Sequence, residues 1–452
     1  MRPASLSNIY WVFYPTTPFS SFWASLFMIY CFFFRGIRNP EDYFYIKTLA
    51  LAMKIKSSWP TRELGHYESE TLLSVMKFLH VFLSIVSLFG GFMYIKLHFS
   101  SLPFFELGHL YICMLMNLVF FSRILTLCLN QKYRDVARDF LTKFHLFFYK
   151  DLSEYAMKTH IRMHLISHRY TLCLTGQMII GILLFNFVPM YNNYAAGNYD
   201  SNNKNISYEH SIYYSYPFDV TTNWKGYIVA NLVNWVVSYF CSSWFCMCDL
   251  FLSLMVFHTY GHFKILLNKL NTFPRPANKT NMFVGSADMN YEMFDEHESE
   301  KVFDLLSDCI NYHRHIVNFI DRLSNVFGPM LLVYYIFHQT TGCLLLLECS
   351  QMTAAALIRY LPLTIIIFQQ LIQLSVIFEI IGSESDKLSD AVYGLPWECM
   401  DDRNRKMVGF LLMNVQEPVH VVALGVANVG VTSMATILKT SMSYFTFLRS
   451  TQ

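Results

Sequence analysis

Four long stretches of this chain contain no charged side chain, and few folds can accommodate them. They are residues 226–248, 323–347, 360–378 and 418–438. A bilayer core about 30 Å thick is crossed by a helix of about 20 apolar residues. Each stretch therefore has the length that one membrane-crossing helix needs.

The composition of the whole chain supports the same class of protein. Of its 452 residues, 54% are hydrophobic, 17% are aromatic and only 15% are charged. That balance is typical of a membrane protein with several crossings rather than of a soluble domain. We predict an all-α membrane protein with seven transmembrane helices. The predicted crossings are residues 73–96, 104–129, 170–192, 226–256, 323–349, 355–381 and 418–447.

The basic residues of the connecting segments predict the orientation. Segments 130–169, 259–322 and 382–417 carry eight, seven and four Lys or Arg residues, whereas the alternate connections are nearly bare. Because basic loops stay on the cytosolic side, the N-terminus is predicted to be cytosolic and the C-terminus extracellular. This is inverted relative to G-protein-coupled receptors. The glycosylation acceptor Asn205, in an Asn-Ile-Ser sequon, falls in a segment predicted to be outside.

The amino-terminal region divides into two parts. Residues 1–41 are aromatic but interrupted by Pro and Ser, and they fit neither a signal peptide nor a crossing helix. We interpret them as an atypical N-terminal extension. Residues 42–72 are more polar and are predicted to form a cytosolic segment before the seven-helix domain 73–452.

Motifs of enzymes and metal sites do not stand out in the sequence. No HExxH, GxSxG, Walker A or GxGxxG motif lies in a suitable context. The 11 Cys residues contain no CxxC pair, and the 16 His residues stand singly. We therefore expect no enzyme, no cofactor and no metal site. The formal net charge of +2 gives no reason to expect a nucleic-acid partner.

The outer halves of the predicted helices are rich in aromatic residues. A pocket of apolar side chains with a few polar groups is what a hydrophobic small molecule requires, and an ordinary aromatic belt with core packing is the alternative. The candidate ligand-binding residues are Phe105, Tyr111, Phe187, Tyr191, Tyr227, Asn231, Trp235, Tyr335, His338 and Tyr360.

Charged residues at membrane depth are a second kind of candidate. Arg123 and Asp249 fall in the inner parts of the second and fourth predicted crossings. Charges at such depth are costly unless they are paired or wetted. We predict that Asp249 faces other helices.

The predicted last crossing, residues 418–447, is unusually poor in bulky side chains. Small and hydroxylated residues allow helices to approach closely, and they also suit a face turned to water. Composition alone leaves both a tightly packed bundle helix and a pore-lining helix open.

Several motifs of the carboxyl-terminal third resemble those of insect odorant receptors. They are DAVYGLPWECM at 390–400, NRK at 404–406, VQEP at 415–418 and ILKTSMSYFTFLR at 437–449. The resemblance extends upstream through FCMCDLFLSL at 245–254 and covers roughly residues 42–452. Residues 1–41 have no counterpart in that family, which by this resemblance implies a mis-called start site. LPWECM, NVQEPV and ILKTSMSYFTFLR look most like the branch of moth sex-pheromone receptors.

The resemblance implies a tuning subunit of a ligand-gated, non-selective cation channel in the plasma membrane of olfactory sensory neurons. Such a subunit assembles with a shared co-receptor into a hetero-tetramer around a central pore. By this resemblance residues 403–417 form a cytosolic inter-subunit helix, and 418–447 form the pore helix. Phe447 and Thr451 would form the hydrophobic gate, and Ser450 would contact ions at the narrowest point.

The resemblance also implies the class of ligand, a long-chain volatile such as an unsaturated acetate, aldehyde or alcohol. A gustatory-type receptor channel and a general odorant receptor for another volatile remain alternatives. A gustatory receptor would carry a TY-then-QF pattern in the last helix, and no QF follows Tyr444. A metabotropic receptor would need the opposite orientation, and a transporter would show internal repeats or broken helices.

Overall fold

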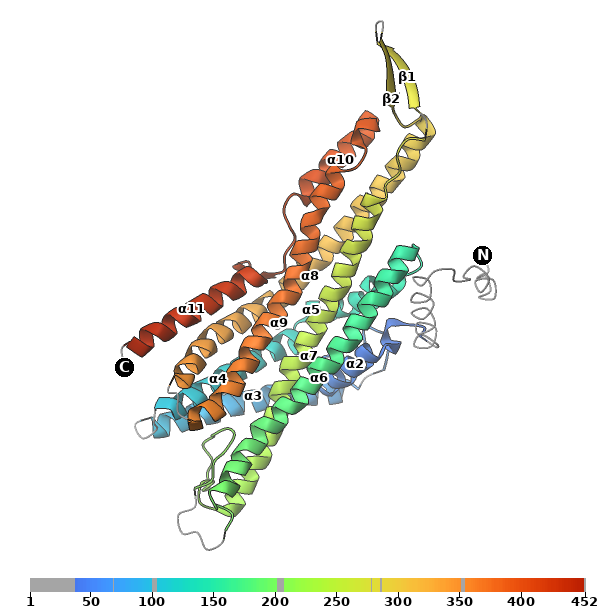
Figure 1. Cartoon of the computed structure of the whole chain (residues 1–452). Helices are drawn as coiled ribbons and strands as arrows, with labels where there is room; N and C mark the ends of the chain where they lie inside the picture. Colours follow the sequence, from blue (N-terminus) through green and yellow to red (C-terminus); the bar gives the residue numbers. More distant parts are fainter. Residues whose placement is uncertain are drawn as a thin grey trace, which may run out of the picture.

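The protein is a bundle of long helices, seen in a computed structural model that describes residues 37–67, 69–99, 104–200, 207–277, 279–284, 287–350 and 354–450 (Figure 1). Its helices are α2 (Phe44–Ile55), α3 (Glu70–His98), α4 (Phe104–Ile124), α5 (Gln131–Asp139), α6 (Glu154–Ala195), α7 (Trp224–Asn271), α8 (Glu296–Cys349), α9 (Ala354–Tyr393), α10 (Asp402–Val415) and α11 (Val431–Ser450). Short π or 3-10 turns are η2 (Pro40–Asp42), η3 (Leu125–Leu129), η4 (Phe140–Phe144), η5 (Leu146–Phe148) and η6 (Trp397–Cys399). Strand β1 (Lys279–Val284) pairs antiparallel with β2 (Ala287–Glu292), and β3 (Val422–Ala423) with β4 (Ala427–Asn428).

Six helical segments among the described residues are long and apolar enough to cross a membrane. They are α3, α6, α7, α8, Leu110–Leu129 and Tyr360–Cys399. The prediction of an all-helical membrane protein is thus confirmed, and each of the first six predicted crossings overlaps one of these segments. Helix α11 is not among the six, so the count of seven crossings and the orientation stay predictions.

Helices α6 to α9 continue well beyond the apolar part of the chain. Helix α7 alone has 48 residues, which at about 1.5 Å per residue is more than twice the length needed to cross a core of about 30 Å. At the extended end lie α10 and the β1–β2 hairpin, and at the opposite end lies the loop between α6 and α7 (Figure 1). The segments 259–322 and 382–417, expected as connections, are therefore mostly helical.

Histidines that stand apart in the sequence meet where α2 packs against the bundle. Tyr43 Oη lies 2.9 Å from His160 Nε2, and Tyr45 Oη lies 3.0 Å from His145 Nε2. The ring centroids of His145 and His258 are 3.9 Å apart. Burial lowers the pKa of His145 well below its usual value. These contacts tie the N-terminal segment to α6 and α7.

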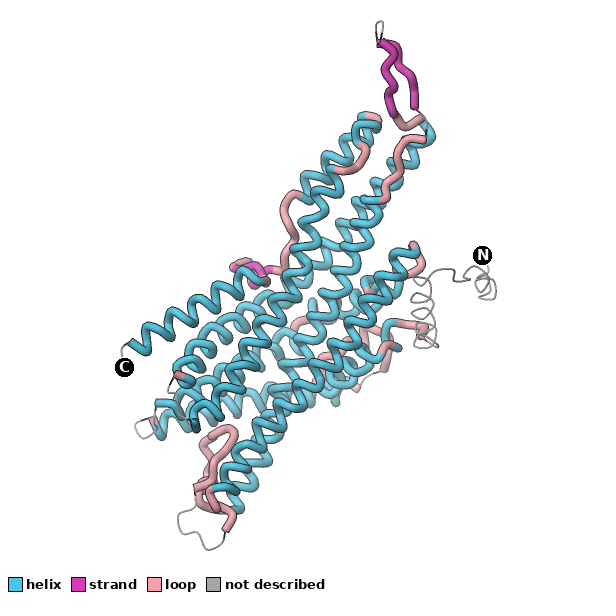
Figure 2. Tube along the Cα trace, viewed as in Figure 1, coloured by secondary structure: helices cyan, strands magenta, loops and turns pink. Residues whose placement is uncertain are grey.

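The predicted start of the last helix, at residue 418, is wrong. Residues between α10 and α11 form the tight β3–β4 hairpin instead, and helix α11 begins at Val431 (Figure 2). Proline at 418 has no N–H to donate and restricts the residue before it, which ends a helix. At the turn, Leu424 and Gly425 have positive φ angles of 50° and 72°, a conformation that interrupts a helix.

The hairpin is held between two long helices. The Val419 N–H donates to Ser385 Oγ of α9 at 2.9 Å, and the Val422 N–H donates to Ser324 Oγ of α8 at 3.2 Å. On α8, a Cβ at Gly328 would lie 2.8 Å from the Leu424 nitrogen. Only glycine therefore allows the hairpin to approach α8 this closely. The start of α11 is fixed against α8 and α9.

Lys56 is a buried cation at the carboxyl end of α2. It is 2% exposed, and its amino group donates to Ser243 Oγ at 2.6 Å and to the Ala52 carbonyl at 3.1 Å. Among the described residues no carboxylate pairs with it. Burial lowers the pKa of Lys56 to about 7, because the charged form loses its hydration.

We expect Lys56→Met to raise the melting temperature of the protein in detergent at pH 7, on the order of a few degrees. The unfolded chain keeps the Lys56 proton up to its ordinary pKa of 10.5, whereas the folded chain releases it near pH 7. Between these values the unfolded state binds more protons, so the stability of the natural protein rises with pH. The gain from Lys56→Met should therefore shrink as the pH rises from 7 toward 10.

The matched control is Lys54→Met, since Lys54 is exposed near the end of the same helix. It should change the melting temperature little, and equally at all pH values. A lower melting temperature of Lys56→Met across the whole pH range would contradict the cost that we assign to the buried charge.

Candidate functional site

The candidate ligand-binding residues of α4 and α6 lie mostly on the surface of the chain. Tyr111 of α4 and Phe187 and Tyr191 of α6 are exposed. Phe105 belongs to α4, but its side chain lies outside the described residues. These four positions do not define an interior pocket by themselves.

Helices α6 and α7 bring three of the candidates together. The rings of Phe187 and Trp235 meet edge to face, with centroids 5.3 Å apart. One turn before Trp235, the Asn231 amide lies 3.8 Å from the Met190 sulfur. This is an aromatic and thioether contact between two helices, with one polar amide at its edge.

Tyr227 lies at the end of the α6–α7 pair, beside the connecting loop. Its ring stacks on Tyr208 with centroids 4.4 Å apart, and its hydroxyl lies 2.8 Å from the Tyr199 hydroxyl. The Asn193 amide donates to the same hydroxyl at 3.4 Å. Both the ring and the hydroxyl are therefore occupied in fixing the loop between α6 and α7. Tyr227 is buried for a structural reason that its own contacts explain.

His338 of α8 is buried without a hydrogen bond. Its ring lies 4.2 Å from Tyr334 and 5.1 Å from Phe337 by centroids, and neither ring nitrogen has a partner among the described residues. The Tyr334 hydroxyl and the Thr341 hydroxyl are also buried without partners there. Buried polar groups are nearly always paired. Three such groups within two turns of one helix make this stretch of α8 a candidate site.

The neighbours of His338 on α8 contact the start and the middle of α11. The Tyr335 hydroxyl accepts from the Gly430 N–H at 3.2 Å, and the Gln339 amide donates to Ser441 Oγ at 3.3 Å. Tyr360 of α9 is buried in the same hydrophobic core. His338 thus sits between two contacts that join α8 to the last helix.

Beside His338 lies an ion pair between α4 and α7. Arg123 donates to Asp249 Oδ1 at 2.8 Å and to the Trp244 carbonyl at 3.3 Å, and both charged side chains are buried. It also donates to the Phe245 carbonyl and lies 4.0 Å from the centroid of that ring. The expectation that Asp249 faces other helices is confirmed.

Helix α11 packs one side against α8 and α9 and leaves the other side uncovered within the chain. The exposed positions Thr432, Thr436, Lys439, Ser443, Phe447 and Ser450 recur every three or four residues and so share one face. Phe447 is 63% exposed there. The hydroxyls of Thr436 and Ser443 donate to carbonyls of their own helix, four residues back. Thr451 and Asn205 lie outside the described residues.

Six long apolar helices among the described residues, with an ion pair buried between two of them, define a multi-pass membrane protein. Residues 107–442 match the family model described as 7tm Odorant receptor. The match spans well over half of the sequence, and the chain belongs to the insect odorant receptor family.

Individual relatives agree with this assignment. Odorant receptor 13a of Drosophila melanogaster is 23% identical over 358 residues, which are 74% of this chain and 78% of that protein. The insect olfactory receptor OR5 from Machilis hrabei, alone and in complex with eugenol, has a similar structure with a TM-score of 0.70. It is 14% identical, and the match covers 90% of this chain and 98% of that one. At this identity the likeness shows the fold alone.

The family predicted from the carboxyl-terminal motifs is confirmed, and its named relatives are receptors. The moth pheromone branch, the gate residues and the ligand-binding set stay predictions. Sequence reasoning missed Thr341. Thr341 lies three residues after His338 and seven after Tyr334 in an apolar helix, so the three share one face, and this spacing was the available signal.

We expect Arg123→Met to destabilise the protein by about 3–5 kcal/mol, because it leaves the Asp249 carboxylate buried without its partner. The double variant Arg123→Met with Asp249→Leu should recover much of that loss, since it removes both charges. Unfolding of the purified protein in detergent, followed by heat and denaturant, measures the difference.

Asp249→Leu alone serves as the reciprocal control and should cost about as much as Arg123→Met. A double variant that is as unstable as the sum of the two single variants would contradict the assignment. The side chains would then act independently rather than as a pair.

Proposed function

We propose that this odorant receptor is the tuning subunit of a ligand-gated, non-selective cation channel in the plasma membrane of olfactory sensory neurons. It assembles with a shared co-receptor into a hetero-tetramer around a central pore. The N-terminus is cytosolic, α11 makes the seventh crossing, and the C-terminus is extracellular. The observation that carries the proposal is the uncovered hydroxyl-bearing face of α11, which in a family member is suited to water and to neighbouring subunits.

The interior of the helices accommodates a long-chain volatile of the moth sex-pheromone type, an unsaturated acetate, aldehyde or alcohol. Apolar burial at about 25 cal/mol per Å² holds the hydrocarbon without any ion pair. The head group pairs with the buried His338 ring, whose nitrogens have no partner among the described residues. The ring contacts of His338 with Tyr334 and Phe337 supply the apolar surroundings.

Ligand binding reaches the pore through the two contacts that flank His338. Repacking of α8 at this point moves Tyr335 and Gln339. These side chains are hydrogen-bonded to Gly430, just before α11, and to Ser441 within it. A shift of α11 outward widens the constriction at Phe447, with Ser450 and Thr451 beyond it. A hydrophobic constriction of this kind opens by wetting.

We expect His338→Phe to raise the half-activating concentration of the best ligand about tenfold, which is the worth of roughly one hydrogen bond. The maximal current should stay unchanged. The measurement is the current of cells that express the receptor with the co-receptor, against a panel of long-chain acetates, aldehydes and alcohols. Each ligand is paired with its hydrocarbon analogue, and the analogues should not distinguish His338→Phe from the natural receptor.

Tyr111→Phe is the matched control, since Tyr111 also belongs to the candidate set but is exposed on α4. It should leave all responses unchanged. Loss of affinity in Tyr111→Phe, with none in His338→Phe, would move the binding site to the outer surface of α4. If no member of the panel evokes a current in the natural receptor, the proposal of a pheromone ligand is wrong. A general odorant receptor or a gustatory-type receptor channel would then be favoured.

We expect Phe447→Ala to raise the resting cation current in the absence of ligand, because the smaller side chain lets water enter the constriction. Met442→Ala is the control, as Met442 is exposed on another side of the same helix. Unchanged leak in Phe447→Ala would place the gate elsewhere.

The same cells test the orientation. An epitope tag after Gln452 should bind antibody on intact cells. A tag that becomes accessible only after permeabilisation would overturn the proposed topology.

A further inference from the structure

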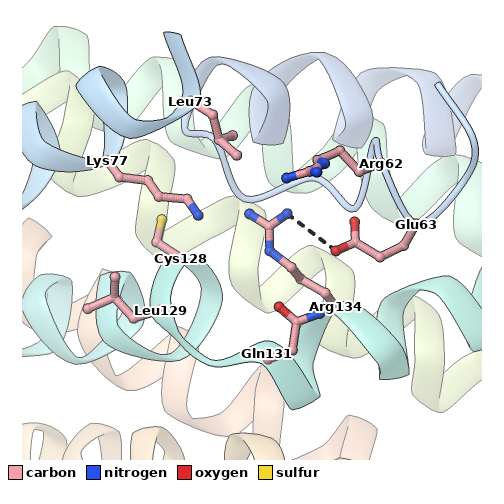
Figure 3. Close-up of a pocket in the computed structure, with 8 residues that line it drawn as sticks. All are labelled: Arg62, Glu63, Leu73, Lys77, Cys128, Leu129, Gln131 and Arg134. Carbon is pink, nitrogen blue, oxygen red and sulfur yellow. Dashed lines mark hydrogen bonds and ion pairs between the residues drawn. The ribbon is translucent and has the colours of Figure 1, made fainter. Parts of the chain in front are cut away.

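A polar cavity of about 540 Å³ lies where α3 begins and α4 ends (Figure 3). Its volume falls within the range of about 300–1,000 Å³ that is usual for small-molecule sites. The lining comes from the α2–α3 connection, α3, η3 and α5. The residues are Arg62, Glu63, Leu73, Lys77, Cys128, Leu129, Gln131 and Arg134. Three cations and one carboxylate leave the lining with two positive charges.

The cavity lies at the boundary of the apolar layer. Leu73 and Lys77 are near the start of α3, and Cys128 and Leu129 end the apolar segment Leu110–Leu129. Leu129 and Leu72 are exposed beside it. A ligand here meets apolar surface on one side and basic side chains on the other, which is the arrangement of a membrane interface.

Arg134 makes only long contacts with the described part of the protein. Arg134 is 6% exposed at its side chain and makes two contacts among the described residues. They are 3.5 Å to Glu63 Oε1 and 3.4 Å to the Ser57 carbonyl, both at the long limit for a hydrogen bond. A guanidinium has five N–H donors. Arg134 is therefore a buried cation whose donors have capacity for a better acceptor.

Arg62 and Lys77 turn toward the same space as Arg134 (Figure 3). Arg62 pairs with Glu70 at 2.9 Å, but both side chains are more than half exposed. An exposed pair of this kind contributes little energy, so Arg62 can exchange Glu70 for another anion. Glu63 works against such an anion, since Glu63 Oε2 is already buried without a partner among the described residues.

We propose that this cavity binds the phosphate groups of an anionic ligand, either the headgroup of a phosphoinositide lipid or a soluble inositol phosphate. The phosphate oxygens accept from Arg134 and Arg62, and Lys77 supplies a third positive charge. The site lies at the end of the bundle that carries the N-terminal segment, and its cytosolic placement rests on the proposed orientation. The bound anion bridges α3, α5 and the connection before α3.

Two variants that each remove one charge distinguish binding from a structural role. Arg134→Gln removes the buried cation and should weaken phosphate binding about tenfold or more. Glu63→Gln removes the competing carboxylate and should strengthen it. Each variant breaks the same Arg134–Glu63 pair, so a purely structural effect would move binding in one direction for both.

The experiment uses the full chain in phosphatidylcholine nanodiscs. One arm adds phosphatidylinositol bisphosphate to the nanodisc, and the second adds inositol trisphosphate to the solution. The bound fraction is measured with fluorescent forms of each, and the melting temperature is followed in parallel. Lys132→Gln is the charge control, because Lys132 is exposed and does not line the cavity.

Binding in either arm, weakened by Arg134→Gln, strengthened by Glu63→Gln and unchanged by Lys132→Gln, supports the proposal, and the arms identify the source of the phosphate. No binding in both arms, or a shift in the same direction for Arg134→Gln and Glu63→Gln, overturns it. The measurement needs no odorant and no current. A negative binding result therefore does not affect the channel proposal. If the channel proposal is wrong, the binding result can still be interpreted.

Discussion

The paired charges of Arg123 and Asp249 are the constraint around which the membrane helices are arranged. Either charge alone inside an apolar bundle would lose its hydration without compensation, so the two must meet. Their contact at 2.8 Å fixes α4 against α7. The Arg123 guanidinium also lies 5.7 Å from the ring centroid of Tyr334 on α8. The same side chain therefore contacts α8 as well as α7.

The position of α8 in turn determines what the last helix can do. Tyr335 bonds to Gly430, just before α11, and Gln339 bonds to Ser441 in the middle of α11. Ser324 and Gly328 contact the hairpin before α11. Helix α11 is thus attached to α8 at several heights and to α9 through Glu379, which accepts from the Val431 N–H at 2.8 Å. Its other face stays uncovered. A displacement of α8 would therefore act on α11 directly through these contacts.

Hydropathy predicted six of the helices well, because bilayer thickness and side-chain polarity dominate there. It failed at residue 418 because the uncharged run continues through the β3–β4 hairpin, and hydropathy does not register a turn in which Leu424 takes a positive φ angle. Pro418 was the available signal. The candidate set was only partly informative, since aromatic content alone does not separate the buried, unpaired His338 from the exposed Tyr191. The meeting of His145 and His258 depends on packing between distant segments, which single-residue patterns do not encode.

The basic cavity and the ion pair lie along one stretch of chain. Arg123 occupies the last turn of α4, and the π turn η3 that follows supplies Cys128 and Leu129 to the cavity wall. The Cys128 thiol also donates to the Lys56 carbonyl at 3.4 Å, and the Lys56 amine bonds to Ser243 of α7, one residue before Trp244, whose carbonyl accepts from Arg123. An anion held by Arg134 would therefore restrain the end of the helix whose charge positions α7 and α8. Coupling between two binding sites is reciprocal. An odorant that repacks α8 would therefore change the affinity of the cavity for phosphate by the same factor by which bound phosphate changes the affinity for the odorant.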